Sequence, residues 1–183
     1  MKSRLRGVVY AAVALAALAG TSAFAQQAPA APANGAQAAL VKDVGNLSDK
    51  FSGLAKVMAG KYDWRPMQGV RSVGDVFNLI INENNMLAGL LTGAPQGRGG
   101  GMGGATPITD PAAMQEALSA SYAKVSQALS GLSAAELSAP VTLFGQNTTK
   151  QGAVWMLLAD QHEHLGQSIA YARSNNVVPP WSK

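Results

Sequence analysis

Residues 149–173 read TKQGAVWMLLADQHEHLGQSIAYAR and contain both histidines of the chain. Apolar residues recur in this stretch at three- and four-residue spacing, which predicts one long helix with a buried face. Thr148 or Thr149 is the expected N-cap, and Asn175-Asn176 is the expected end. The residues expected to be buried are Val154, Leu157, Leu158, Leu165, Ile169 and Ala172.

Three further segments show the same periodicity and predict three more amphipathic helices. The first covers about residues 36–59. The second starts after Ser72, with Asp75 in the capping-box position, and the third starts at Asp110-Pro111 and ends near Leu132. Their predicted buried faces contain Leu40, Val44, Leu47, Phe51, Leu54, Val57, Val73, Val76, Phe77, Ile80, Leu87, Leu91, Met114, Leu118, Tyr122, Val125 and Leu129.

The connections between these helices contain no alternating pattern long enough to predict a sheet. We expect a single helical turn at Ser133–Glu136, an extended segment at 140–146, and aromatic residues of loop 61–71 packed on the helices. The glycine-rich segment 92–109 lacks a phosphate-binding motif and a preceding strand, so it is interpreted as a mobile connection that could fold over a site. The predicted fold is therefore all-α, a four-helix bundle, and the long connection leaves room for a crossover.

The first 25 residues have the features of a secretory signal peptide. Three basic residues precede an apolar run at 8–20, and Ala23-Phe24-Ala25 provides the small-x-small site for cleavage after Ala25. We therefore expect a periplasmic or secreted protein without a membrane anchor after cleavage. An uncleaved anchor helix is the alternative.

The predicted organisation is a signal peptide at 1–25, an Ala/Pro/Gln-rich linker at 26–37 and the helical domain at 38–183. Three of the fourteen basic residues lie in the signal, and ten residues are acidic, so the remaining chain is almost neutral. This balance gives no support for nucleic-acid binding. The chain has no cysteine, which excludes disulfides, thiolate zinc sites and covalently attached c-type haem.

Glu83 has an unusual position in the second predicted helix. On a helical wheel Glu83 and Asn84 fall within the apolar arc. A buried carboxylate is costly unless it is paired. Two interpretations are open: the carboxylate escapes to solvent at the edge of the bundle, or it belongs to a site.

The last helix offers a partner for such a site. Asp160 and His164 are four residues apart and share one face, which is the spacing that presents two ligands to one ion. His162 lies about 200° around the axis from His164, so the two histidines cannot bind one metal from one face. We expect His164 to lie inside, within reach of Asp160 or Glu83, and His162 to point outward.

The segments YDWRP…GVRSVGDV and HLGQ.IAYAR.N..VPPWS, in this order and spacing, resemble the DinB-like superfamily, including thiol transferases such as the bacillithiol transferases. The resemblance implies a four-helix bundle, often dimeric, and a divalent metal such as zinc or nickel on three histidines. The three histidine positions correspond to Leu79, Asp160 and His164 here. Only His164 matches, so the implied metal triad is degenerate.

Two functional hypotheses follow. In the first, the metal site has been lost or remodelled, and the protein binds an unidentified small molecule or interacts with a partner. In the second, the protein is a divalent-metal-dependent hydrolase or thiol transferase using Asp160, His164 and Glu83, assisted by His162 or Tyr171. A bound zinc or nickel ion and the absence of any metal are both open, and the resemblance implies a homodimer.

Overall fold

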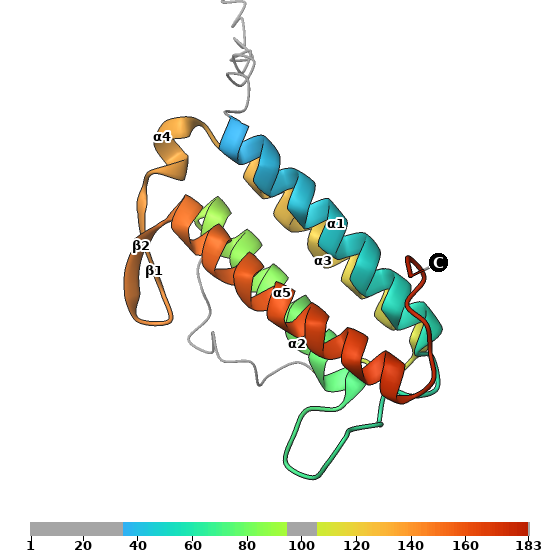
Figure 1. Cartoon of the computed structure of the whole chain (residues 1–183). Coiled ribbons are helices and arrows are strands. Elements are labelled where there is room, and N and C mark those ends of the chain that lie inside the picture. Colours follow the sequence, from blue (N-terminus) through green and yellow to red (C-terminus); the bar gives the residue numbers. More distant parts are fainter. Residues whose placement is uncertain (1–34, 95–105, 183) are drawn as a thin grey trace, which may run out of the picture.

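The computed structural model describes residues 35–94 and 106–182, and this part of the chain is mostly helical (Figure 1). The predicted signal peptide, most of the predicted linker and much of the glycine-rich segment, including its expected role as a lid, lie outside the described residues. The helices and strands are α1 (Gly35–Val57), α2 (Val73–Thr92), α3 (Pro111–Ser130), α4 (Ala134–Leu137), β1 (Pro140–Leu143), β2 (Gln146–Thr149) and α5 (Lys150–Ser174).

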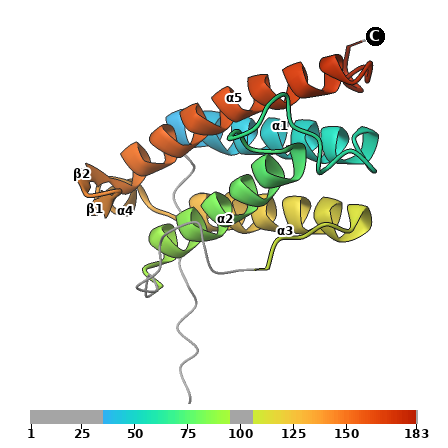
Figure 2. The ribbon, with the colours of Figure 1, turned by 90° about the horizontal axis from the view of Figure 1, so that it is seen from below.

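The four long helices pack around one core. Helix α1 contacts α3 and α5, and α2 also contacts α3 and α5. In both views α2 and α3 run in the same direction, whereas α1 and α5 run in the opposite direction (Figures 1 and 2). The chain between α2 and α3 is therefore a crossover connection, which the length of segment 92–109 allowed. Among the described helices, none combines the length and the apolarity that crossing a membrane requires.

Local side-chain chemistry sets the helix starts, as the sequence predicted. Ser72 and Asp75 form a capping box, and the Asp110 side chain accepts a hydrogen bond from the N–H of Ala113. The Thr149 side chain caps α5 by accepting from the N–H of Gly152. Each cap satisfies an N–H group that has no partner within its own helix.

The predicted buried faces are confirmed with two exceptions, Val57 and Ile169, which are only half-buried. The loop before α2 packs back on the helices as expected. Tyr62 is buried and its hydroxyl donates to the carbonyl of Ala55 at 2.8 Å, while Trp64 packs against the core.

Helix α1 begins at Gly35, three residues before the predicted domain boundary at 38. Gln37 explains the early start. Its side chain is buried, and its amide nitrogen donates to the carbonyls of Leu129 and Leu132 at 2.7 and 2.9 Å. Positions 35–37 of the predicted linker therefore belong to the folded helix.

A β-hairpin between α4 and α5 corrects the expectation of a fold without a sheet. Strands β1 and β2 are antiparallel, with Pro140 opposite Thr149 and Leu143 opposite Gln146. The two turn residues, Phe144 and Gly145, have φ values of 50° and 77°. The strands are mostly exposed. Their sequences therefore lack the alternation of apolar and polar residues that predicts a half-buried strand.

Candidate metal centre

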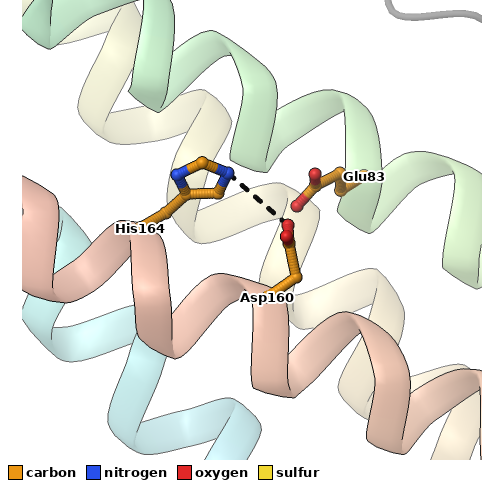
Figure 3. A group of neighbouring side chains, drawn as sticks. All are labelled: Glu83, Asp160 and His164. Atoms are coloured by element: carbon orange, nitrogen blue, oxygen red, sulfur yellow. Dashed lines mark ion pairs between the residues drawn. The ribbon is translucent and has the colours of Figure 1, made fainter.

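A pocket and a group of converging potential ligands occur together between α2, α5 and the tip of the hairpin. The pocket has a volume of about 520 Å³. Glu83 of α2 and Asp160 and His164 of α5 lie along its wall, and their side chains point toward one another (Figure 3). Helix packing therefore brings together the three residues that the sequence proposed as ligands.

The distances in this group are short. One potential ligand atom from each of the three residues lies within 4.8 Å of the other two. The Nε2 atom of His164 is 3.5 Å from Oδ2 of Asp160, as the four-residue spacing predicted. His162 points away from the group, as expected, and its Nε2 lies 2.9 Å from Oδ2 of Asp43 on α1.

Glu83 does not escape to solvent, so that interpretation of the sequence is wrong. Its side chain is on the core side of α2, and only 4% of the residue surface is exposed. Its Oε2 atom is buried and has no hydrogen-bond partner among the described residues. A buried carboxyl oxygen without a partner is costly, and it is one indication that the site is completed by something else.

The electrostatics of Glu83 follow from this position. Burial raises its pKa to about 8, and the negative charge of nearby Asp160 adds to the shift. Gln161 and Arg71 act in the opposite direction because they favour the charged form. Near neutral pH, Glu83 therefore holds a proton that a cation could displace.

A chain of hydrogen bonds fixes the orientation of His164. The hydroxyl of Tyr171 donates to the carbonyl of Arg71 at 3.1 Å, so it accepts from the amide nitrogen of Gln167 at 2.8 Å. The amide oxygen of Gln167 then faces Nδ1 of His164 at 2.9 Å. Nδ1 therefore carries a hydrogen, and in the neutral imidazole the lone pair then lies on Nε2, which faces Asp160.

The helices that carry the site are held in register by a second, fully buried group of polar side chains. Tyr122 of α3 donates to the amide oxygen of Gln161 at 3.0 Å, and Gln161 donates to Asn84 of α2 at 2.9 Å. Asn84 in turn donates to the hydroxyl of Ser121 at 3.1 Å. Gln161 follows Asp160 and Asn84 follows Glu83, so this network positions both carboxyl groups.

Several residues at the site were not identified from the sequence. Arg71 and Phe144 line the pocket, and Gln167 orients the histidine. The i, i+3 and i+7 spacing of His164, Gln167 and Tyr171 on one helix was a signal for the hydrogen-bond chain. No comparable signal pointed to Phe144, because its position depends on the hairpin.

The comparisons with known proteins identify the family. The sequence model described as the DinB superfamily matches residues 48–168, which is more than half of the chain. The chain belongs to the DinB superfamily. A solved DinB-like protein from Bacillus subtilis has a similar fold, with a TM-score of 0.63, 15% sequence identity, and coverage of 79% of this chain and 97% of that one. No curated protein sequence is significantly similar to this chain.

The superfamily resemblance placed the ligand positions at Leu79, Asp160 and His164, and all three residues line the same pocket. Leu79 is buried and lies one helical turn before Glu83 on α2. A leucine cannot bind a metal. Glu83 offers a carboxylate from the same helix instead.

The donor set fits a divalent cation. A carboxylate oxygen and an imidazole nitrogen that both lie about 2.1 Å from one tetrahedral ion are about 3.4 Å apart. The His164–Asp160 separation of 3.5 Å agrees with this value. Once a cation displaces the proton of Glu83, Glu83 and Asp160 would supply two negative charges, and a carboxylate oxygen of Glu83 would supply a third ligand atom within 4.8 Å of the other two.

The raised pKa of Glu83 predicts an unusual pH dependence of stability for the metal-free protein. Unfolding returns the pKa of Glu83 from about 8 to its ordinary value of 4.5. The contribution of Glu83 to the free energy of unfolding is therefore fully present below pH 4.5 and is lost as the pH rises to 8. Relative to Glu83→Gln, the parent should lose at least about 1 kcal/mol of unfolding free energy between pH 5 and pH 8.5.

Urea melts in EDTA at these two pH values measure the difference. Glu163→Gln is the control, because Glu163 is exposed on the same helix as Asp160 and should follow the parent at both pH values. If the free energy of unfolding changed by the same amount between the two pH values in the parent and in Glu83→Gln, Glu83 would not be buried in its neutral form.

Proposed function

We propose that this member of the DinB superfamily is an exported four-helix-bundle protein that binds a divalent cation, zinc or nickel, through Glu83, Asp160 and His164. The cation then serves as the attachment point for a small molecule in the adjoining pocket. The observation that carries the proposal is the convergence of the three side chains, since a carboxylate oxygen of Glu83 lies within 4.8 Å of ligand atoms of Asp160 and His164. The buried Oε2 atom of Glu83, which has no hydrogen-bond partner among the described residues, supports it.

The surrounding residues support a binding role. The hydrogen-bond chain from Arg71 through Tyr171 and Gln167 engages Nδ1 of His164, so Nε2 is the nitrogen that faces the site and would bind the metal from the neutral ring. When bound, the cation would supply Lewis acidity and an open coordination position. The pocket beside the three ligands gives a small molecule access to that position.

A purely structural role for the three residues is the competing explanation. Glu83 and Asp160 would then share a proton, and His164 would only pair with Asp160. In that case the three residues would not bind a divalent cation measurably. Metal titration distinguishes the two explanations.

We expect tag-free protein to bind one zinc ion per chain in calorimetric titrations. His164→Ala and Glu83→Gln should each weaken zinc binding at least about tenfold, because each removes one of three ligands. His162→Ala is the matched control and should bind like the parent, since His162 points away from the site. Circular dichroism confirms that the variants are folded.

Equal zinc binding by His164→Ala and His162→Ala would contradict the proposed ligand set. Absence of stoichiometric zinc or nickel binding in the parent would favour the structural explanation and the interpretation of a lost metal site.

We also propose that the protein is exported. Three features support export: the basic residues at the N-terminus, the apolar run at 8–20 and the cleavage pattern Ala23-Phe24-Ala25. The mature N-terminus is then expected at Gln26, and intact-mass measurement on protein from the producing cells checks it. Retention of Met1 in the exported fraction would contradict cleavage and favour an uncleaved anchor.

A further inference from the structure

We infer that the small molecule bound in this pocket is an organic anion with an apolar body, whose charged group pairs with Arg71 and whose body packs on Phe144 and Met156. This inference rests on the proposed function, because the pocket beside the three ligands is the same one. It adds the chemical class of the ligand, which the metal site alone does not define.

Arg71 presents an unpaired positive charge at the pocket. Its guanidinium has no hydrogen bond or ion pair with any residue in the described part of the chain, although the residue is exposed and lines the pocket. Arg65, on the same loop, behaves differently because it pairs with Asp75 at 3.6 Å. An arginine that its own protein leaves unpaired beside a pocket is suited to a carboxylate or a similar anion.

The backbone under Arg71 is well anchored. Its carbonyl accepts the hydroxyl of Tyr171 at 3.1 Å, and the Tyr171 ring contacts Trp64 edge-to-face with 5.3 Å between ring centroids. Ser72, the next residue, is the N-cap of α2. The guanidinium therefore extends from a fixed point, which lowers the entropy lost when a ligand binds.

The hairpin supplies the apolar side of the pocket. Phe144 lines the pocket and is 60% exposed, although a phenyl ring gains free energy when it leaves water. Its φ of 50° is uncommon for a bulky residue and costly to maintain. Met156 of α5 is half-buried and lines the same pocket. A ligand with an apolar body would cover both side chains.

The charges of the occupied site also favour a monoanion. A divalent cation balances the carboxylates of Glu83 and Asp160, and the charge of Arg71 then remains. Coulomb attraction in a partly buried pocket is stronger than in bulk water, so an anion is favoured and a cation is rejected. Binding of the metal and of the anion should reinforce each other.

Three probes test the chemical class on the mature, zinc-loaded protein by calorimetry: 3-phenylpropionate, 3-phenylpropylamine and propionate. We expect 3-phenylpropionate to bind at least about tenfold more tightly than the amine, which lacks the anion, and than propionate, which lacks the apolar body. Equal binding of the carboxylate and the amine, or no binding of either, would overturn the inference.

Variants assign the two halves of the ligand. Arg71→Gln should weaken 3-phenylpropionate at least about tenfold, whereas Arg65→Gln removes the same charge from the same loop and should not. Phe144→Ala should weaken 3-phenylpropionate several-fold and leave propionate unchanged. Trp181→Ala is its control, because Trp181 is another exposed aromatic residue but does not line this pocket. Equal effects of a variant and its control would overturn the corresponding half of the inference.

A parallel series in EDTA separates this inference from the proposed metal site. If zinc binds but the probes show no preference for an anion, the ligand class is wrong and the metal site stands. If zinc does not bind, yet 3-phenylpropionate binds in EDTA and is lost in Arg71→Gln, the metal site is wrong and the anion pocket stands.

Discussion

Replacing Phe77 with alanine is expected to lower the free energy of unfolding by about 3–5 kcal/mol. Phe77 is fully buried and lies at the centre of an aromatic cluster. Its ring meets Phe51 and Tyr62 edge-to-face, with centroid distances of 6.3 and 5.7 Å, and Phe51 stacks on Tyr122 at 6.3 Å. The variant therefore loses the transfer free energy of the ring, its aromatic contacts and the packing around the cavity left behind.

The loss is a large fraction of the 5–15 kcal/mol that stabilises a typical domain. Denaturant melts measure it as a lower midpoint with an unchanged slope. Leu158→Ala, at another buried core position on α5, should cost about 2–5 kcal/mol.

Phe144→Ala provides the control, because it removes the same ring from an exposed position. It should change the free energy of unfolding by less than about 0.5 kcal/mol. A loss below this value for Phe77→Ala would show that the ring does not form part of the core.

The aromatic cluster also connects stability to the site. Tyr122 stacks on Phe51 and donates its hydroxyl to Gln161, the neighbour of Asp160. A cavity at Phe77 is therefore expected to loosen the helices that carry the proposed ligands. Zinc affinity measured on Phe77→Ala well below its melting midpoint would report this coupling.

The features predicted from the sequence are those that local chemistry determines. The starts at Ser72, Asp110 and Thr149 depend on hydrogen bonds within one helical turn, and the structure has them at these positions. The Asp160–His164 pair was predictable for the same reason, since both residues lie on one face of one helix.

The features that the sequence did not predict depend on how helices pack. Gln161 and Asn84 are hydrogen-bonded across α5 and α2, and their pairing requires the relative register of two helices. Glu83 was recognised as misplaced on an apolar face, but its burial next to Asp160 follows only from that packing. The hairpin was missed because Phe144 occupies a turn position with positive φ, where glycine or asparagine is the usual signal.

Restoring histidines at Leu79 and Asp160 together is expected to raise zinc affinity by orders of magnitude, at least about 100-fold. Leu79 and Asp160 line the pocket beside His164. Their replacement would complete three imidazoles, a donor set that suits zinc better than two carboxylates and one imidazole.

Helix geometry supports this design. Position 160 is one turn before His164 on α5, and position 79 is one turn before Glu83 on α2. Both new side chains would start from backbone that the buried Gln161–Asn84 hydrogen bond holds in register at 2.9 Å. Such preorganisation is what converts additional ligands into affinity.

Competition with a zinc chelator of known affinity measures the double variant Leu79→His/Asp160→His against the parent. Leu79→Phe/Asp160→Asn is the matched control, because it changes the same positions without adding a strong ligand, and it should bind zinc no better than the parent. Circular dichroism and a denaturant melt establish that each variant is folded before affinities are compared.

The same double variant also tests whether Glu83 is the third ligand in the parent. Adding Glu83→Gln to the double variant should have a smaller effect on zinc than it has in the parent, because the imidazole at position 79 takes over the contribution of α2. A folded double variant that binds no more zinc than the parent would show that Leu79 and Asp160 do not occupy the superfamily's ligand positions. The proposed metal site would then lose the correspondence on which its assignment partly depends.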